Sequence, residues 1–362
     1  LKSFLATDAC WDPFAPNFLP PMKLSVVLEA SVIVLAFAIG AALSWGDSWT
    51  EIFSGGLLTV AWLIMNGSSP IGWLVVIASQ CVTEAHWSFF GETIVARFGS
   101  LYDGWGGWAL AMVGYGIFLV MYIVHGFMLL PFDLAASGRN AVKDYKIQPN
   151  KYMAGLHTGK LCRALAINAL VVLAYLSAMA AQVVSSRGTQ GMRVLDENDA
   201  FTLPSKKEQF LCFGAGVLWN EVMFYWSHRL LHHPRLYARF HKQHHEYTAP
   251  FALAAIYCGP TEMVLSNLWP FLGIVHVCRF HMFFTYCWTA NAIMGTQTHH
   301  SGHKWPWMCT LDHQPYVHDL HHQQFQCNFG NIGLFDLLCG TSRAPVTIKT
   351  KPSLSNVETK LE

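Results

Sequence analysis

The sequence predicts an all-α integral membrane protein, a bundle of transmembrane helices with a histidine-rich domain on the cytosolic side. Three observations support this fold class. Hydrophobic residues make up 53% of the 362 residues and charged residues only 12%, several long stretches carry no charged side chain, and most histidines gather in the C-terminal half. Because an ordinary soluble domain has about 25% charged residues, we expect most of this chain to lie in lipid.

Charge and cysteine content exclude other classes of protein. The formal net charge is +1 with neutral histidines, which gives no basic surface for nucleic acid. The ten cysteines are scattered singly, without a CxxC pair. Zinc fingers and disulfide scaffolds have paired cysteines, so we expect buried thiols here and no nucleic-acid partner.

Charge-free stretches locate the expected membrane spans, each of which needs about 20 apolar residues. The candidates are 24–45, the interval between Glu51 and Glu84, 108–130, 163–187 and 208–226. Within the second candidate, Asn-Gly-Ser-Ser-Pro at 66–70 interrupts the apolar run, so 57–79 is either one broken span or a hairpin. Two further apolar stretches, 263–278 and 280–298, are parted by Arg279 and predict a hairpin that dips into the membrane.

These spans and the distribution of basic residues predict three regions and an orientation. Residues 1–130 form a hydrophobic region with about three spans, 131–343 a histidine-rich domain, and 344–362 a polar tail. The loop 131–163 holds six basic residues against two acidic ones, and 229–242 is again basic. Positive charge in short loops marks the cytosolic side of a membrane, so we expect both segments there.

The histidines carry the chemical signal. Fifteen of the 18 lie between His228 and His322. Several are spaced three or four residues apart, which places side chains on one face of a helix. These spaced histidines are His228 and His232 with His233 beside them, His241, His244 and His245, His299 and His303 with His300, and His318, His321 and His322.

Neutral imidazole is a good metal ligand, and its second nitrogen can be oriented by an outer acceptor. Eight to ten imidazoles converging from four segments exceed what one metal binds, so the count predicts two metals. Zinc, copper and iron all suit imidazole, and the residues alone leave that choice open. Of the other histidines we expect His86, His125, His157, His276 and His281 to be structural, while His313 is undecided.

The histidine-rich stretch resembles the fatty acid hydroxylase/sterol desaturase superfamily, whose members carry an HxxxH box and two HxxHH boxes. The match covers about residues 140–343 and is closest to C4-methylsterol oxidases. The segments that carry it are FYWSHRLLH at 224–232, HKQHHEYTAP at 241–250, HSG at 300–302 with WPW at 305–307, HDLHH at 318–322, CNFG at 327–330, FD at 335–336 with GT at 340–341, and DYKIQPNK at 144–151.

The resemblance implies a membrane mono-oxygenase of the endoplasmic reticulum that uses two iron ions and O2 on an unactivated lipid. It implies electrons from NAD(P)H through cytochrome b5 or a reductase, because no flavin or nicotinamide motif is present. The ligand roles carried over fall on His228, His232, His241, His244, His245, His318, His321 and His322. A second tier comprises His233, His299, His300 and His303. Glu221 is expected either to orient a ligand histidine through a hydrogen bond or to be an interfacial carboxylate.

Two positions depart from the pattern of the sterol oxidases. Their Ala-His-Pro-x-Glu reads Cys258-Gly259-Pro260-Thr261-Glu262 here, so Gly259 replaces a histidine. Their His-Ser-Gly-Tyr turn reads His-Ser-Gly-His303. We hypothesise that His303 compensates near the metals.

These two departures bear on which substrate is oxidised rather than on the type of reaction. The resemblance favours a sterol or triterpenoid-pathway lipid and C4-methyl oxidation, with squalene epoxidation as the alternative and fatty acyl or sphingoid hydroxylation third. A metal transporter is the rival of another class, but transporters place ligands at midplane inside spans. Tyr225, Trp226 and Trp288 would line the lipid pocket or act as interfacial anchors and packing residues.

Overall fold

The computed structural model describes residues 22–45, 48–66, 69–134, 145–149, 151, 158–196, 200–304 and 313–343. The predicted tail at 344–362 lies outside these residues. Described elements are α1 (Met22–Leu43), α2 (Trp49–Asn66), α3 (Pro70–Gln80), α4 (Glu84–Phe98), α5 (Gly106–Leu134), α6 (Thr158–Ser185), α7 (Lys206–Leu231), α8 (Pro234–Phe240), η2 (His244–Glu246), η3 (Ala252–Ala254), α9 (Pro260–Glu262), η4 (Met263–Leu268), α10 (Trp269–Val277), α11 (Met282–His299), α12 (Gln314–Gln324) and α13 (Leu334–Leu338).

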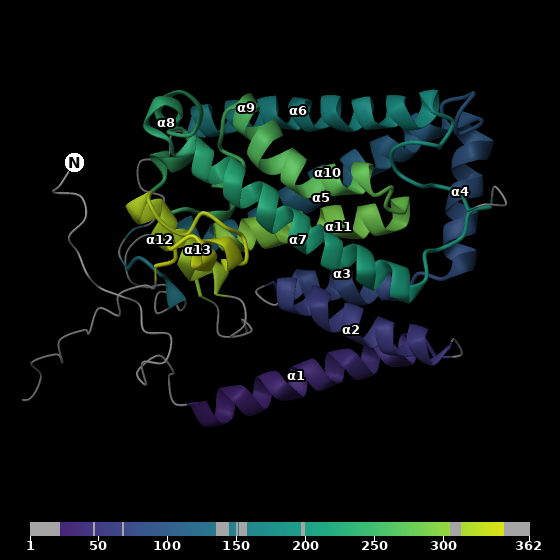
Figure 1. Cartoon of the computed structure of the whole chain (residues 1–362), viewed down its shortest axis with the longest axis horizontal. Helices are drawn as coiled ribbons and strands as arrows, with labels where there is room; N and C mark the ends of the chain where they lie inside the picture. Colours follow the sequence, from purple (N-terminus) through teal and green to yellow (C-terminus); the bar gives the residue numbers. More distant parts are fainter. Residues whose placement is uncertain are drawn as a thin grey trace, which may run out of the picture.

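The all-α prediction is confirmed, since the described residues form helices and only two isolated β-bridges. Long helices make up the body of the molecule, with α6 along one side, α5, α7, α10 and α11 inside, and α1 and α2 on the opposite side (Figure 1). Helices α12 and α13 lie together at the end where α8 also sits. The histidine-bearing elements thus gather at one end of the bundle.

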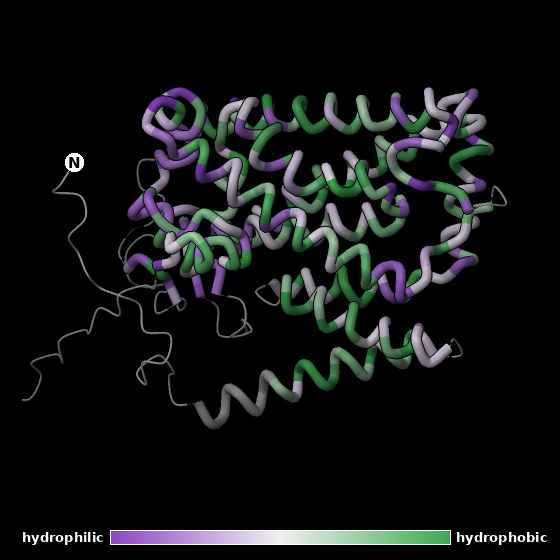
Figure 2. Tube along the Cα trace, viewed as in Figure 1, coloured by the Kyte–Doolittle hydropathy of each residue, from purple (hydrophilic) through white to green (hydrophobic). Residues whose placement is uncertain are grey.

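Among the residues that the structure describes, two helices have the length and apolar composition needed to cross a membrane: 106–133 of α5 and 158–185 of α6. Their outward faces expose large apolar side chains such as Ile123, Phe127 and Leu170. Figure 2 shows hydrophobic colour along much of α6 and hydrophilic colour around α8 and α12. This exterior fits a helical membrane protein whose polar end carries the histidines; which end faces the cytosol stays a prediction.

Helix α7, predicted as a span, does not reach the apolarity of α5 and α6. Its polar side chains Gln209, Asn220 and Glu221 are turned into the protein and buried. A helix of mixed composition is stable there because its polar groups find partners inside the bundle.

The two ambiguous apolar regions both form hairpins of helices. Helices α2 and α3 are separate and contact each other, so 57–79 is a hairpin rather than one broken span. Ser69 starts α3 by accepting a hydrogen bond from the Gly72 amide at 3.2 Å. The stretch after Pro260 likewise forms η4 and α10, then α11, with Arg279 at φ 52° in the turn between them.

Aromatic packing fixes α11 against its neighbours beneath the histidine-rich end. The rings of Trp62 and Phe213 are 4.8 Å apart at their centroids, and the Trp62 ring is 6.0 Å from that of Trp288 on α11. Trp288 is fully buried and donates its indole N–H to the Phe271 carbonyl at 2.7 Å. Such pairs add about 0.5–1.5 kcal/mol each beyond simple burial, so they hold α2, α7 and α11 together.

Helix α5 touches the segment behind the second histidine box at a glycine. A β-carbon at Gly126 would lie 2.4 Å from Leu253 Cδ2 and 2.7 Å from Gln297 Nε2. We predict that Gly126→Val lowers stability by about 1–3 kcal/mol, because overpacking forces side chains out of their rotamers. Thermal unfolding in detergent measures this.

The matched control for this substitution is Gly116→Val on the same helix, where an added β-carbon meets nothing within 4 Å. Equal melting temperatures for the two variants would show that close packing at Gly126 does not matter.

Candidate metal centre

The first histidine box lies where α7 ends. His228 is in the last turn of the helix, and His232 is its C-cap, with its backbone N–H bonded to the His228 carbonyl at 3.2 Å. The four-residue step therefore places both rings on one face, 5.1 Å apart at their centroids. Arg229, between them, donates to the Tyr225 hydroxyl at 2.7 Å and does not enter the cluster.

The second box is not a single helical turn. His241 caps α8, two residues of turn follow, and His244 and His245 begin η2. The rings still converge, since His241 lies 4.6 Å from His245 and 5.3 Å from His244. The spacing thus brings the three side chains together although the predicted continuous helix is absent.

The third box lies on α12, and α11 supplies one more ring. His318 and His322 are one helical turn apart, with ring centroids at 4.8 Å. His300, the C-cap of α11, places its ring 4.3 Å from that of His318. Two successive helices therefore meet at this point.

Nine imidazoles form two adjoining groups whose ligand atoms lie within 4.8 Å of one another in each group. One group consists of His228, His232, His241, His245 and His321, and the other of His244, His300, His318 and His322. The groups touch where the rings of His245 and His322 are 4.7 Å apart. Two sites side by side agree with the number of metals expected from the histidine count.

Backbone carbonyls orient many of these rings. The Nδ1 atoms of His228, His321 and His322 lie 2.8, 2.6 and 3.0 Å from the carbonyl oxygens of Phe329, Cys327 and Tyr247. Nδ1 of His300 likewise lies 2.8 Å from the Thr296 carbonyl. A carbonyl oxygen only accepts, so each Nδ1 carries the proton, and the Nε2 lone pair faces into the cluster.

The inward nitrogens are close together and are not protonated. Nε2 of His318 lies 2.9 Å from Nε2 of His300, and Nε2 of His245 lies 3.0 Å from that of His241. Burial lowers the pKa of His228 to about 4 and that of His300 to about 3, so these rings are neutral at pH 7. The converging Nε2 lone pairs have no N–H group among them, so together they form a set of ligand atoms that fits a cation. Iron is one of the metals that imidazole binds well.

Three second-tier histidines lie outside both groups. His233 is exposed, and its Nδ1 accepts from the Arg235 amide at 3.3 Å as the N-cap of α8. His299 is half-buried and lines the cavity beside the groups. The Nδ1 of His303 lies 2.7 Å from the Ser301 carbonyl and 4.0 Å from Asp133 Oδ1. The structure brings His300 into a group and leaves these three apart.

Glu221 acts on a loop rather than on a histidine. Its buried carboxylate accepts hydrogen bonds from the amides of Asn331, Ile332 and Phe335 at 2.9, 2.8 and 3.0 Å. No hydrogen bond joins it to a histidine within the described residues. It is therefore neither an interfacial carboxylate nor a direct partner of a ligand, and it fixes the loop that follows Phe329.

Asp336, which the sequence analysis did not single out as a site residue, holds the same loop from the other side. Its oxygens accept from the amides of Phe329 at 2.8 Å and Gly330 at 2.6 Å and from the Thr341 hydroxyl at 2.7 Å. The Asp336 carboxylate binds the amides on either side of the Phe329 carbonyl, and it thereby fixes the carbonyl that orients His228. The Phe-Asp segment in the family resemblance was the available signal for it.

Glu262 is the carboxylate beside the histidines and was also missed. Its Oε2 lies 2.9 Å from Nδ1 of His241, and its Oε1 lies 3.9 Å from Nδ1 of His244. Desolvation by burial raises the pKa of Glu262 well above its usual value. It is the final residue of the Cys-Gly-Pro-Thr-Glu segment, where the resembled pattern keeps a glutamate.

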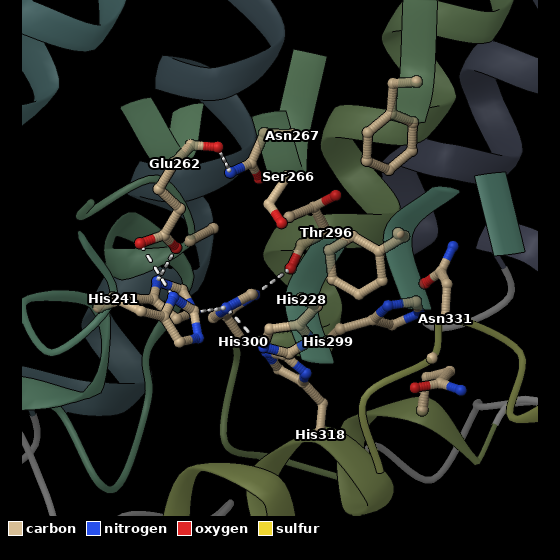
Figure 3. A pocket seen from close by; sticks show the side chains of 16 residues that line it. His228, His241, Glu262, Ser266, Asn267, Thr296, His299, His300, His318 and Asn331 are labelled. Atoms are coloured by element: carbon tan, nitrogen blue, oxygen red, sulfur yellow. Dashed lines mark hydrogen bonds and ion pairs between the residues drawn. The ribbon is translucent and has the colours of Figure 1, made fainter. Parts of the chain in front are cut away.

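Two cavities adjoin at the histidines. The metal-side cavity is lined by five of the clustered histidines together with Glu262, Ser266 and Asn267 (Figure 3). The apolar cavity lies between α5, α6, η4, α10 and α11. Ala255, Asn267, Phe271 and Thr296 line both. These four residues therefore form a wall that the two cavities share.

The three predicted pocket aromatics have different places. Trp288 lines the apolar cavity. Tyr225 is buried and hydrogen-bonded to Arg229 and Thr341, so it packs the base of the first box. Trp226 is half-exposed on the outside of α7.

The role of Glu221 yields a stability prediction. Glu221→Ala leaves the buried amides of Asn331, Ile332 and Phe335 without their acceptor. An unpaired buried donor costs about 1–3 kcal/mol, so we expect a loss of roughly that size or more in the unfolding free energy of metal-free protein. The control is Glu92→Ala on α4, an exposed residue, and an equally small effect of both would refute the role.

The segment that carries this site is similar to known proteins. Residues 213–341 match the family model named fatty acid hydroxylase. The chain is 33% identical over 200 residues to a fatty acid hydroxylase of Mycosarcoma maydis, covering 55% of this chain and 49% of that protein. It is 40% identical over 125 residues to fatty acid hydroxylase domain-containing protein 2 of Macaca fascicularis, covering 34% of this chain and 36% of that protein.

A second group of relatives acts on sterols by name. Methylsterol monooxygenase 1 of Gallus gallus is 34% identical over 146 residues, covering 39% of this chain and 48% of that protein. The chain spans about half the length, or less, of these curated relatives, and no solved structure matches it. Residues 213–341, which contain both histidine groups, therefore match the fatty acid hydroxylase family model and are similar to methylsterol monooxygenases.

Proposed function

We propose that the chain is a membrane-bound di-iron mono-oxygenase that uses O2 to oxidise a sterol or triterpenoid-pathway lipid, most like C4-methylsterol oxidation. The observation that carries this is the double group of nine histidines beside an apolar cavity. The similarity to hydroxylases and methylsterol monooxygenases supports a lipid oxygenase. The pair of irons, the substrate and the electron route are the parts we propose.

The proposed ligands are the nine histidines of the two groups, so His300 joins the eight carried over from the family resemblance, while His233, His299 and His303 are left out. When bound, iron supplies the redox chemistry that activates O2, with electrons from NAD(P)H through cytochrome b5 or a reductase. In our proposal the endoplasmic reticulum membrane supplies the lipid, and the site faces the cytosol.

The protein itself would orient the histidine rings, position the lipid beside them and exclude water from the site. Backbone carbonyls such as those of Phe329 and Thr296 fix the ring tautomers, so the Nε2 atoms already point inward before a metal binds. Ala255 and Phe271 in the shared wall bring a lipid carbon beside the histidines and keep water from it. Because a misplacement of order 1 Å can cost about a hundredfold in rate, this wall sets which carbon reacts.

The apolar cavity also bears on the other functions considered. Its lining, within the described residues, contains no charged side chain. A free fatty acid would meet no cation there, whereas squalene, a hydrocarbon, would be accepted by such a surface. Squalene epoxidation is therefore the second candidate. A transporter needs a polar path, and the histidine groups here lie against an apolar chamber instead.

The ligand set predicts metal content. Purified protein is expected to carry about two irons per chain, and His318→Ala, at the centre of the second group, to lose at least one of them. His303→Ala and His281→Ala are the matched controls, since both are buried histidines outside the groups. Elemental analysis decides, and loss of iron in His303→Ala alone would return that residue to the ligand set.

The reaction is tested by complementation in two yeast strains, one lacking C4-methylsterol oxidase and one lacking squalene epoxidase. We expect rescue of the first strain and no rescue by His244→Ala, because that ring belongs to the second group. Growth of the second strain only would replace methyl oxidation by epoxidation, and growth with His244→Ala would remove the metal from the mechanism.

A further inference from the structure

The shared wall between the two cavities contains few polar side chains. Of the residues that line both cavities, Ala255 and Phe271 are apolar, and Asn267 and Thr296 are polar. Any part of a lipid that lies close to the histidines must pass these two side chains. Figure 3 shows Asn267 and Thr296 on the same cavity as His300 and His228, with Ser266 between them.

Asn267 is poorly bonded to the protein. Its Nδ2 lies 3.5 Å from the Glu262 carbonyl and 4.0 Å from Cys258 Sγ, distances at which hydrogen bonds are weak. Its Oδ1 accepts no hydrogen bond from a residue that the structure describes. By contrast, the Asn168 amide donates to two backbone carbonyls at 2.8 and 2.9 Å. A half-buried amide with weak partners is suited to a polar group of a ligand.

The backbone that carries Asn267 has an unusual form. Residues Met263–Leu268 make a π-helical turn, which is rare and frequent at functional sites. Pro270 has no amide hydrogen for the Ser266 carbonyl, four residues before it, so a regular α-helix is interrupted here. The wider turn lets two successive residues, Ser266 and Asn267, line the metal-side cavity.

The other polar groups nearby already have partners. The Ser266 hydroxyl donates to Ser227 at 2.8 Å, and the Tyr122 hydroxyl donates to the Leu253 carbonyl at 2.8 Å. Gln297 bonds both His125 and the Tyr122 carbonyl. Thr289 lines only the apolar cavity, away from the shared wall. Two further amides, Gln314 and Asn331, line the metal-side cavity but not the apolar one, and Asn331 donates to Asn220 at 2.7 Å. Asn267 is thus the amide that lines both cavities.

The Thr296 hydroxyl donates to the Ala292 carbonyl at 2.8 Å, so it can only accept from a ligand. We propose that Asn267, assisted by Thr296 as an acceptor, binds a hydroxyl of the lipid within a few bonds of the carbon that is oxidised. The proposal rests on the proposed function and narrows its substrate class to neutral lipid alcohols. The amide can accept from that hydroxyl through Oδ1 and donate to it through Nδ2. A 4-methylsterol has its hydroxyl on the ring carbon next to the methyl-bearing one, whereas squalene has no hydroxyl.

The test compares 4-methylcholestanol with 4-methylcholestane, which lacks the hydroxyl, for binding and turnover by the iron-loaded full chain in nanodiscs. We expect the alcohol to bind at least about tenfold more tightly, the effect of one good hydrogen bond to a buried partner. Asn267→Leu should remove this preference with unchanged iron content. Leu272→Ala, in the apolar cavity, is the control and should weaken both lipids equally.

Each outcome decides between the readings. Equal binding of the two lipids by the unmodified chain, with both oxidised, would overturn the role of Asn267 but leave the oxygenase standing. If Asn267→Leu weakened the binding of both lipids equally, Asn267 would contribute only packing, and the proposal would likewise be overturned. Failure of the iron-loaded chain to bind or oxidise either lipid would end the sterol assignment and this inference together.

Discussion

The convergence of nine neutral imidazoles in one buried volume is the constraint on which the rest of this structure depends. Their Nε2 atoms approach one another to about 3 Å, and lone pairs at that distance repel unless a cation lies among them. The outward Nδ1–H groups must meanwhile find acceptors, because a buried polar group without one is costly. Loops that present carbonyls at the right places, such as those of Cys327 and Phe329, supply these acceptors.

Three buried carboxyl groups support the histidine cluster in different ways. Glu221 and Asp336 are buried, yet each accepts from backbone amides, and such charge-assisted bonds offset the cost of taking a carboxylate out of water. Together they fix the turn that precedes α13 and thereby the Phe329 carbonyl. Glu262 instead faces two rings directly, since its carboxyl oxygens lie toward the Nδ1 atoms of His241 and His244. An outer carboxyl group in this place orients a ligand histidine. Removing the first two would loosen the scaffold, whereas the third acts on the ligands.

The metal side and the lipid side are separated by a thin wall rather than by distance. Helix α11 contributes to both, since Thr296 orients His300 through its carbonyl while its side chain lines the apolar cavity. Trp288, packed on Phe284, sets the far wall of that cavity. A shift of α11 would therefore move the His300 ring and the wall of the apolar cavity together. In the proposed function this one helix would keep the lipid in register with the histidines.

By itself the sequence determined the helical class and the three histidine boxes, because spacing along a helix is a local property that brings His228 and His232 together whatever the surroundings. Only the tertiary structure decided that His300 joins a group while His303 turns to Asp133, and that Glu262 lies against the rings. Those contacts join residues many positions apart, and their outcome depends on how helices pack. The apolar cavity likewise exists only between packed helices, so no local pattern could show its shape.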